Sequence, residues 1–324
     1  MTPPDDREGA VVPRAVRIAE FGGTEVLKVV DIDVPVPGEG EVVLEIAAAG
    51  VNPVDWKIRA GLRSTSPLVE PIGLGSDGSG VVAAVGAGVT EYAVGDEVIA
   101  RGLAGSYASH VLARPEQLTL KPAGLGWAQA AALGIPAGTA YQVLKSLGLR
   151  SGETLLVHAG SGGVGQAAIQ LARHWGASVV ATASEPNHAR LVELGAIPVV
   201  CGPGLVDRVR AAAPGGIDVV LDAAGTDEAI DASLELVADR SRIAEIVTLD
   251  RVRELGIQAW SNRPGFMTPE AAALRVEALA FVAELAAEGQ YDIEVAASFP
   301  LEEVAAAHEL SETGHVRGKI VLVP

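Results

Sequence analysis

Three glycines near the middle of the chain have a spacing suited to binding the diphosphate of a dinucleotide. Gly160, Gly162 and Gly165 form a G-x-G-x-x-G motif directly after the apolar run Thr154–His158 and at the start of a helical pattern. The first glycine permits a tight turn, the second lets backbone approach the diphosphate, and the third allows close packing of helix and strand. We therefore predict that the segment Gly160-Ser161-Gly162-Gly163-Val164-Gly165 binds a nicotinamide dinucleotide. The alternative is a glycine-rich loop without a ligand.

The next strand bears on which nicotinamide coenzyme is used. An NAD enzyme places an Asp or Glu at the end of this strand to bind the ribose hydroxyls, but Val180 to Ser184 contains no acid. Ser184 could donate to a 2′-phosphate, and Arg190 on the following helix could pair with its charge. Alternatively, Ser184 is a helix cap and Arg190 a solvated side chain, while Glu185 could itself bind ribose hydroxyls. The pattern favours NADPH over NADH.

The elements that would position this motif alternate between apolar strands and amphipathic helices. A parallel sheet covered on both faces, as in a Rossmann fold, is the expected product. Its predicted strands are 154–158, 178–182, 198–201, 218–222, 242–249 and 257–260. The helices predicted between them are 165–175, 186–194, 205–213 and 228–237.

The first third of the chain has a different texture, with short strands separated by Gly and Pro. Its predicted strands are 15–19, 27–33, 41–50, 80–85 and 97–100, which suit a small barrel-like domain. The tail is predicted to form a helix over 269–289, a strand near 293–299, a helix over 301–313 and a strand over 319–323. We predict an α/β protein with a β-rich domain at 1–133 and 266–324 and a Rossmann domain inserted at 134–265.

Composition excludes several classes of protein. The 324 residues include 24 Lys plus Arg and 41 Asp plus Glu, a net charge of −17 that does not suit a general nucleic-acid binder. One cysteine, Cys201, excludes an intramolecular disulfide and a cysteine-rich metal cluster; we expect it to be buried and inert. No signal peptide is predicted over 1–13 and no membrane span anywhere, so the expected location is the cytoplasm.

Several segments resemble the medium-chain dehydrogenase/reductase superfamily, in particular its zinc-free quinone oxidoreductase and enone reductase branch. The resemblance covers nearly the whole chain and implies a GroES-like β-rich catalytic domain beside the Rossmann domain. Besides the glycine motif, the matching segments are Ala49–Gly61, Leu74–Val82, Gly95–Val98, Gly105–Ala108, Ala130–Leu133, Gly138–Tyr141 and Gly318–Val321.

The branch is indicated by residues that differ from the zinc alcohol dehydrogenases of the superfamily. Those enzymes have a Cys where this chain has Asn52 and a His-Glu pair where it has Ser76-Asp77. The six histidines show no paired ligand spacing, so no zinc is expected. Without that Lewis acid, direct carbonyl chemistry is difficult, and the resemblance implies hydride delivery to a quinone or to the activated C=C bond of an enone.

Two residues of the front domain are predicted to be catalytic. Asn52 resembles the family's cofactor- and substrate-facing Asn and would donate through its amide to the developing enolate. Lys57 stands at a position that is often Tyr in well-known quinone reductases and Lys in some enone and enoyl reductases. It would stabilise the oxyanion or relay a proton. The alternatives are a turn residue before Pro53 for Asn52 and a solvated lysine for Lys57.

Other residues are assigned more general roles. Trp56, Tyr107 and Trp260 are candidate walls of a substrate pocket, with core packing as the alternative. Coenzyme contacts are further predicted for Thr139, Ala223 and Lys319: Thr139 and Lys319 resemble family positions near the cofactor, and Ala223 follows a Rossmann strand. Asp55 and Asp77 are expected to hold loops.

Four functions remain open from the sequence. The leading one is a zinc-independent, NADPH-dependent reductase of quinones or activated C=C bonds. The second is an enoyl-thioester reductase of a fatty-acid or polyketide pathway. The third is an NADPH-binding protein without turnover, crystallin-like or a sensor, and a carbonyl reductase is a further alternative. A small-molecule substrate and a homodimer paired through the strand near 257–260 are the expected partners, with no nucleic acid or membrane.

Overall fold

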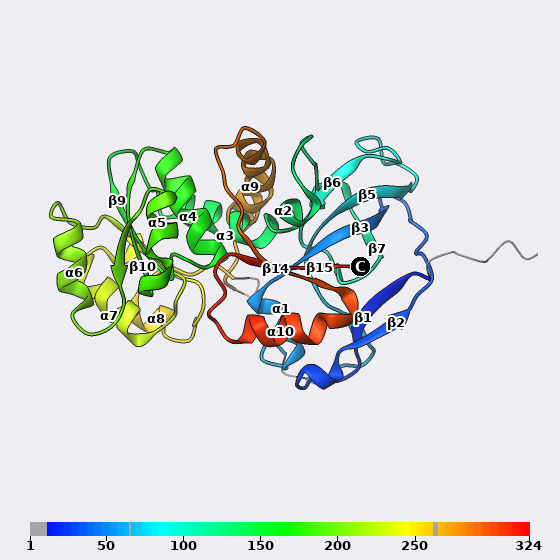
Figure 1. Cartoon of the computed structure of the whole chain (residues 1–324), viewed down its shortest axis with the longest axis horizontal. Helices are drawn as coiled ribbons and strands as arrows, with labels where there is room; N and C mark the ends of the chain where they lie inside the picture. The colour runs from blue at the N-terminus through cyan, green and yellow to red at the C-terminus, as the bar shows by residue number, and fades with distance from the viewer. Residues whose placement is uncertain (1–11, 65, 262–264) are drawn as a thin grey trace, which may run out of the picture. The chain divides into compact units, whose positions relative to one another are not determined.

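Antiparallel strands dominate the first third of the chain in the computed structural model, which describes residues 12–64, 66–261 and 265–324 (Figure 1). The segment 1–13, for which no signal peptide is predicted, lies almost wholly outside these residues. The strands of this part are β1 (Arg14–Ile18), β2 (Lys28–Asp31), β3 (Val42–Val51), β4 (Ile72–Gly73), β5 (Asp77–Val85), β6 (Glu97–Ala100), β7 (His110–Ala113) and β8 (Leu118–Leu120).

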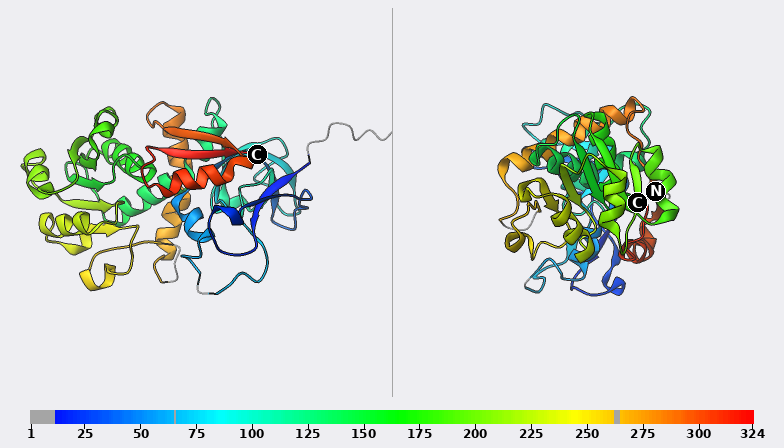
Figure 2. Two further views of the ribbon diagram at one scale, coloured as in Figure 1. Left: turned by 60° about the horizontal axis from the view of Figure 1, so that its bottom comes forward. Right: turned by 90° about the vertical axis from the view of Figure 1, so that its left-hand side faces the viewer.

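Two sheets are built from these strands together with two strands from the C-terminus. The smaller sheet has the order β2-β1-β4. The larger one has the order β14-β15-β3-β5-β6-β8, with β7 also paired to β3, and includes β14 (Val295–Pro300) and β15 (Lys319–Val323). Helix α10 (Val304–Glu312) packs against α1 (Pro53–Arg59) and β3, so the C-terminal tail returns to the front of the chain as predicted (Figure 2).

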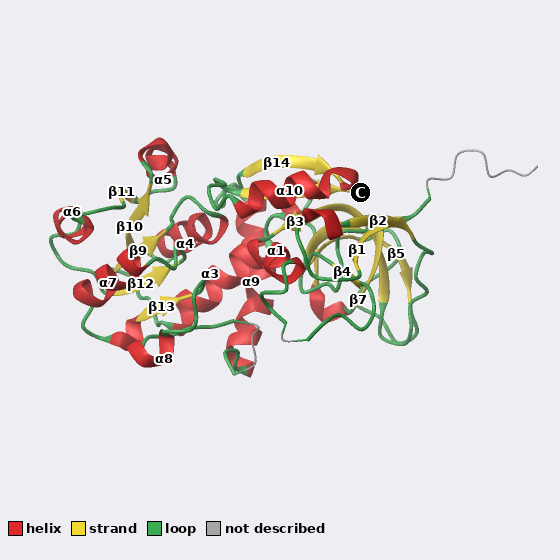
Figure 3. Cartoon of the chain, turned by 90° about the horizontal axis from the view of Figure 1, so that it is seen from below, coloured by secondary structure: helices red, strands yellow, loops and turns green. Residues whose placement is uncertain are grey.

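A five-stranded parallel sheet forms the other part of the molecule, and Figure 3 shows its strands lying between helices. The strand order is β11-β10-β9-β12-β13, with all neighbours parallel, which confirms the predicted Rossmann-like sheet. The strands are β9 (Thr154–His158), β10 (Ser178–Ala183), β11 (Ile197–Val200), β12 (Val219–Asp222) and β13 (Ile243–Glu245). Leu155, Leu156 and Val157 are fully buried, as expected for a strand covered on both faces.

Two helices of this part begin at a threonine side-chain cap. Thr226 accepts a hydrogen bond from the Ala229 amide at the start of α7, and Thr268 does the same for Ala271 at the start of α9. The helices of this part are α2 (Trp127–Ala131), α3 (Gly134–Ser146), α4 (Gly163–His174), α5 (His188–Glu193), α6 (Leu205–Ala212), α7 (Asp227–Leu236), α8 (Val252–Leu255) and α9 (Pro269–Ala287). Short 3-10 helices occupy Thr24–Val26, Pro115–Gln117, Glu185–Asn187, Arg240–Arg242 and Leu301–Glu303.

The chain divides into two compact units. The first, here called the β-rich unit, contains Met1–Lys121, Ser298–Glu312 and Ile320–Pro324. The second, here called the Rossmann unit, contains Pro122–Ala297 and Thr313–Lys319. It includes α9, because this helix packs against α3. The limits at 133 and 266 expected from the sequence therefore differ from the division of the contacts, and as domain boundaries they stay a prediction.

Some local expectations are wrong. The strand expected over 242–249 ends at Glu245, because the Glu245 side chain caps the amides of Val247 and Thr248 and turns the chain. The strand expected near 257–260 is reduced to a single bridge between Ala244 and Gln258. Cys201 is exposed just beyond β11 rather than buried. No element was assigned to Gly134–Ser146, where α3 forms, because its residues are apolar almost all round and give no helical period.

None of the described helices is long and apolar enough to span a membrane.

Candidate functional site

The glycine motif forms a tight turn between β9 and α4. Ala159 adopts φ +58°, in the left-handed region, and the Gly160 amide donates to the carbonyl of Thr182 at 2.8 Å. A Cβ at Gly165 would lie 2.3 Å from the Ala159 oxygen, whereas one at Gly162 would meet nothing nearer than that oxygen at 3.6 Å. Gly165 is therefore required by packing, while a Cβ at Gly162 would clash with no protein atom; this is the position at which a Rossmann fold brings backbone close to a diphosphate.

A buried polar group supports the strained residue of this turn. The Thr182 hydroxyl accepts from the Ala159 amide at 3.3 Å and lies 3.3 Å from Nδ1 of His158, to which it can donate. Nε2 of His158 lies 3.2 Å from the Ser233 hydroxyl, which itself donates to the Ala229 carbonyl. Burial lowers the pKa of His158 to about 4, so the ring is neutral and both nitrogens can serve in this network. Sequence reasoning missed His158 and Thr182 as supports of the turn.

The segment before β15 lies against the same turn. The Gly318 amide donates to the Ser161 carbonyl at 3.1 Å, and Gly162 and Gly318 form a parallel bridge. The Lys319 side chain is buried and passes 3.1 Å from the position that a Cβ on Gly163 would take. The structure thus brings Lys319 to the glycine motif. Thr139 lies buried on α3 in the same unit, and Ala223 follows β12.

The end of β10 joins the turn through a residue that sequence reasoning missed. The Asn187 amide nitrogen donates to the Ser184 hydroxyl at 3.1 Å and to the Ser161 hydroxyl at 3.3 Å. Ser184 and Ser161 therefore lie together at the edge where a Rossmann fold holds an adenosine ribose. A signal was available, since Asn at the end of the Ser184-Glu-Pro-Asn187 turn is typical of side chains that bond backward along the chain.

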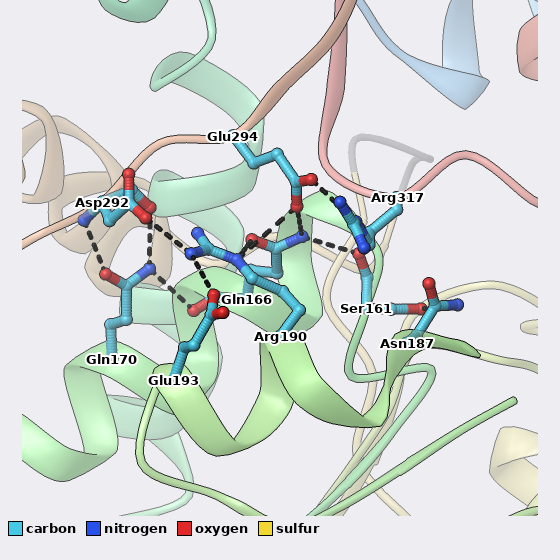
Figure 4. A network of polar contacts seen from close by, with 9 residues as sticks. All are labelled: Ser161, Gln166, Gln170, Asn187, Arg190, Glu193, Asp292, Glu294 and Arg317. Carbon is cyan, nitrogen blue, oxygen red and sulfur yellow. Dashed lines mark hydrogen bonds and ion pairs between the residues drawn. The ribbon is translucent and has the colours of Figure 1, made fainter. Parts of the chain in front are cut away.

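Arg190 is engaged with acidic side chains (Figure 4). Nη1 of Arg190 lies 2.6 Å from Asp292, its Nε donates to Gln166 at 3.1 Å, and Glu294 lies 3.5 Å away. Glu294 in turn binds Arg317 at 2.7 Å. The sequence placed Arg190 beside a 2′-phosphate; in this structure its charge is matched by carboxylates, and the phosphate role stays a prediction.

Two acidic residues end neighbouring strands at this edge of the sheet. Asp222 ends β12 and Glu245 ends β13; they are in register and both are buried. Burial raises the pKa of Asp222, and burial together with the Asp222 charge raises the pKa of Glu245 to about 7, against the opposing effect of backbone amides. Sequence reasoning missed Glu245. The available signal was a polar residue ending an apolar strand, as in the runs that end at His158 and Asp222.

In the β-rich unit, the predicted catalytic Asn52 lies in a buried polar cluster. Its backbone amide donates to Asp55 at 2.8 Å, and its side-chain amide donates to Asp77 at 3.0 Å. The Tyr107 hydroxyl donates to the same Asp55 oxygen at 2.7 Å. Asp55 and Asp77 thus hold loops, as expected. Asn52 is 2% exposed, so its amide is oriented by protein groups.

Tyr107 and the residues around it pack rather than line an open surface. Tyr107 is fully buried, and its ring meets that of His308 edge to face, with centroids 5.8 Å apart. Nη1 of Arg59 reaches Nδ1 of His308 at 3.5 Å, and Arg59 pairs with Glu312. This geometry favours the packing alternative for Tyr107, and its pocket role stays a prediction.

The remaining predicted residues are partly accessible. Lys57 is half-buried on α1, with its ammonium 5.6 Å from the centre of the Trp56 ring. Trp56 and Trp260 are also half-buried, each in its own unit. Among the described residues, no three His, Cys, Asp or Glu side chains are grouped so that they could hold a metal ion.

Comparisons with known proteins agree with this geometry. The family profile described as an alcohol dehydrogenase GroES-like domain matches residues 38–143, and one described as a zinc-binding dehydrogenase matches 194–322. The quinone oxidoreductase of Homo sapiens is 35% identical over 335 residues, covering 97% of this chain and 99% of that protein.

Solved structures of similar fold include an enzyme with its coenzyme. The Escherichia coli quinone oxidoreductase complexed with NADPH has a TM-score of 0.83 and 27% identity, covering 96% of this chain and 100% of that one. The CurK enoyl reductase has a TM-score of 0.84 and 27% identity, covering 97% of this chain and 99% of that one.

Proposed function

The chain belongs to the quinone oxidoreductase family of the medium-chain dehydrogenase/reductase superfamily, and from this premise we propose that it is a zinc-independent, NADPH-dependent reductase of quinones or of the activated C=C bonds of α,β-unsaturated carbonyls. The observation that supports this most directly is that a Cβ on Gly162 would meet no protein atom nearer than 3.6 Å, next to Gly163, which the buried Lys319 side chain approaches. A diphosphate placed there would meet helix amides and a lysine stem, and no Cβ would stand in its way.

The residues of the Rossmann unit would hold the coenzyme. Gly160 to Gly165 would bind the diphosphate, while Ser184 and Asn187 would face the adenosine ribose. Bound coenzyme supplies the hydride. NADPH is proposed because β10 ends without an acid and because the E. coli relative is described with NADPH. Arg190 would have to exchange Asp292 for a phosphate, so we expect the preference over NADH to be modest.

The β-rich unit would contribute groups that stabilise charge on the substrate. The Asn52 side-chain amide donates to Asp77, and Asp55 accepts from the backbone amide of the same residue, so the side-chain amide has a fixed direction without rearrangement during the reaction. Lys57 would stabilise the oxyanion or deliver a proton to the α-carbon. These two roles are proposed from the resemblance together with the orientation of the side chains.

Zinc independence is proposed from residue types. Asn52 and Ser76-Asp77 stand where zinc alcohol dehydrogenases have Cys and His-Glu, and Asn52 binds Asp77 directly. An amide nitrogen that donates to a carboxylate is a poor zinc ligand. Elemental analysis of the purified protein should find no stoichiometric zinc, and a chelator should leave turnover unchanged.

The experiment for this function is a screen of NADPH and NADH oxidation with quinones, short enones and enoyl thioesters. The Lys57→Ala variant should lower kcat with an enone by about 10²-fold, leave the Kd for NADPH unchanged, and recover in part as Lys57→Arg. Lys28→Ala, an exposed lysine of the same unit, is the matched control. Wild-type rates in both Lys57→Ala and Asn52→Ala would refute the proposed oxyanion site.

A second candidate is supported by the CurK enoyl reductase, which has a similar fold. In this alternative the substrate is an enoyl thioester rather than a free enone or quinone. A kcat/KM for enoyl thioesters that exceeds the values for every quinone and free enone in the screen would favour this second function.

A further inference from the structure

Polar side chains end three neighbouring strands of the Rossmann sheet in one row. Asp222 on β12 is in register with His158 on β9 and with Glu245 on β13. Each of the three side chains is at most 1% exposed. In-register residues of parallel strands point to the same face, so the two carboxyl groups are neighbours across the β12–β13 ladder.

Each carboxyl group uses one oxygen to cap the turn that follows its own strand. Oδ1 of Asp222 accepts from the amides of Ala224 and Gly225 at 2.8 and 3.0 Å. Oε1 of Glu245 accepts from the amides of Val247 and Thr248 at 2.6 and 2.7 Å. The other oxygens, Oδ2 of Asp222 and Oε2 of Glu245, are buried, and no donor reaches either of them within the described part of the chain.

The two capped turns are in direct contact. Gly225 has φ +66°, and a Cβ on it would lie 2.7 Å from the Cβ of Val247. The Thr248 hydroxyl donates to the Gly225 carbonyl at 3.3 Å, and the Ile246 amide donates to the Asp222 carbonyl at 3.1 Å. A change in the charge of either carboxyl group should therefore alter the position of both turns.

Within 12–64, 66–261 and 265–324, the charged groups near this pair do not neutralise it. His158, facing Asp222 from β9, is neutral, because burial lowers its pKa to about 4. The charged side chains of the nearby helices are exposed: Asp227, Glu228, Asp231 and Glu235 on α7, and Arg253 and Glu254 on α8. Arg251 is also exposed and pairs with Asp227. Two buried carboxylates at this place would thus repel each other, and none of the described cations compensates their charge.

We propose that Asp222 and Glu245 hold one proton between them, and that this proton keeps the turns 223–225 and 246–248 in the arrangement that receives the coenzyme. The proton leaves a single negative charge on this buried pair, whose Oδ2 and Oε2 atoms accept no hydrogen bond in the described part of the chain. Its loss to solvent leaves two adjacent buried anions, which push the turns apart and weaken binding. The inference rests on the proposed function, because the edge formed by these turns is where that function places the coenzyme. Glu245 is a positioning residue in this account.

Coenzyme affinity across pH tests the proposal. The Kd for NADPH is measured from about pH 5.5 to 8.5 for the wild type, Glu245→Gln and the control Glu254→Gln. The amide of Gln can donate to Asp222 at every pH, so the wild-type Kd divided by the Glu245→Gln Kd should rise about tenfold across this range. Titration of the 2′-phosphate cancels in the ratio. The ratio of wild type to Glu254→Gln should stay within about twofold. A flat ratio for Glu245→Gln would overturn the proposal.

Melting temperature provides a second measurement that needs no coenzyme. Burial raises the pKa of Glu245 in the folded state to about 7, from its ordinary value of 4.5, so its contribution to stability is complete below the unfolded value and is lost as pH rises through about 7. Glu245→Gln should therefore gain in melting temperature relative to wild type between pH 5.5 and 8.5, and Asp222→Asn should show the same trend. Equal pH dependence in all three proteins would overturn the shared proton.

The two measurements separate this inference from the proposed function. If neither NADPH nor NADH binds at any pH, the proposed function fails, and with it the role of the proton in coenzyme binding. The melting comparison would then still support or overturn the shared proton itself.

Discussion

The two units satisfy their buried polar groups in different ways. In the β-rich unit, Asp55 joins Tyr107 and Asn52, which come from separate elements, so the cluster ties the fold together. In the Rossmann unit, Asp222 and Glu245 bind backbone amides of the turns that directly follow their own strands, so their hydrogen bonds are local. The difference indicates that the first cluster mainly stabilises structure, whereas the second shapes an edge that can respond to a ligand or a proton.

The largest expected effect is a loss of stability when the buried cluster of the β-rich unit is disrupted. Asp55→Ala removes an acceptor shared by the Tyr107 hydroxyl and the Asn52 amide, and both donors are buried. Thermal or denaturant unfolding should show a loss of about 3 kcal/mol. Asp31→Ala, at an exposed position of the same unit, should change stability by less than about 0.5 kcal/mol. If Asp55→Ala unfolds like the wild type, the cluster does not stabilise the unit.

Two glycines of the turn between β9 and α4 should respond differently to substitution, one through the stability of the Rossmann unit and the other through coenzyme binding. Gly165→Ala should lower stability by about 1 to 3 kcal/mol, since its Cβ would lie 2.3 Å from the Ala159 oxygen. Gly162→Ala, whose Cβ would meet only the Ala159 oxygen at 3.6 Å, should keep the wild-type melting temperature and weaken NADPH binding about tenfold, or about 1.4 kcal/mol. Unchanged affinity in Gly162→Ala would show that the diphosphate does not lie there.

Loss of the hydrogen bond that supports Ala159 should have a smaller effect on coenzyme affinity, and a second substitution should reverse it. Thr182→Val removes the acceptor for the Ala159 amide, and we expect the Kd for NADPH to rise about fivefold, or about 1 kcal/mol. Because the strain arises at Ala159 with φ +58°, the additional change Ala159→Gly should restore most of the affinity. A double variant that binds as weakly as Thr182→Val would contradict the strain explanation.

The smallest expected effect concerns the coenzyme preference. Asp292→Asn removes one negative charge from Arg190, so the ratio of NADH to NADPH Michaelis constants should rise about threefold, through tighter NADPH. Glu193→Gln removes a more distant charge, at 3.5 Å from the same nitrogen, and should change the ratio less. If the ratio of Michaelis constants is the same in Asp292→Asn as in the wild type, Arg190 does not bind the 2′-phosphate.

Strand and helix patterns made much of the fold predictable. The bounds of Thr154–His158, Glu97–Ala100 and Lys319–Val323 were predicted without error, because each is a run of β-forming residues closed by turn residues. The length of the strand predicted over 242–249 is too great, because a side-chain cap ends the strand at Glu245. Hydrophobic periodicity does not reveal such a cap. Helix Gly134–Ser146 was missed since a helix buried almost all round has no amphipathic signal.

Residue types and spacing by themselves determined the glycine motif, the two-part organisation and the resemblance to a family, because these depend on local geometry within a few residues. Only the tertiary structure decided that Asn52 donates to Asp77, that Arg190 pairs with Asp292, and that Asp222 and Glu245 are neighbours. Each of these contacts joins residues more than twenty positions apart. Burial and register, which create such contacts and set the charge each group can bear, are properties of the packed chain rather than of any short segment.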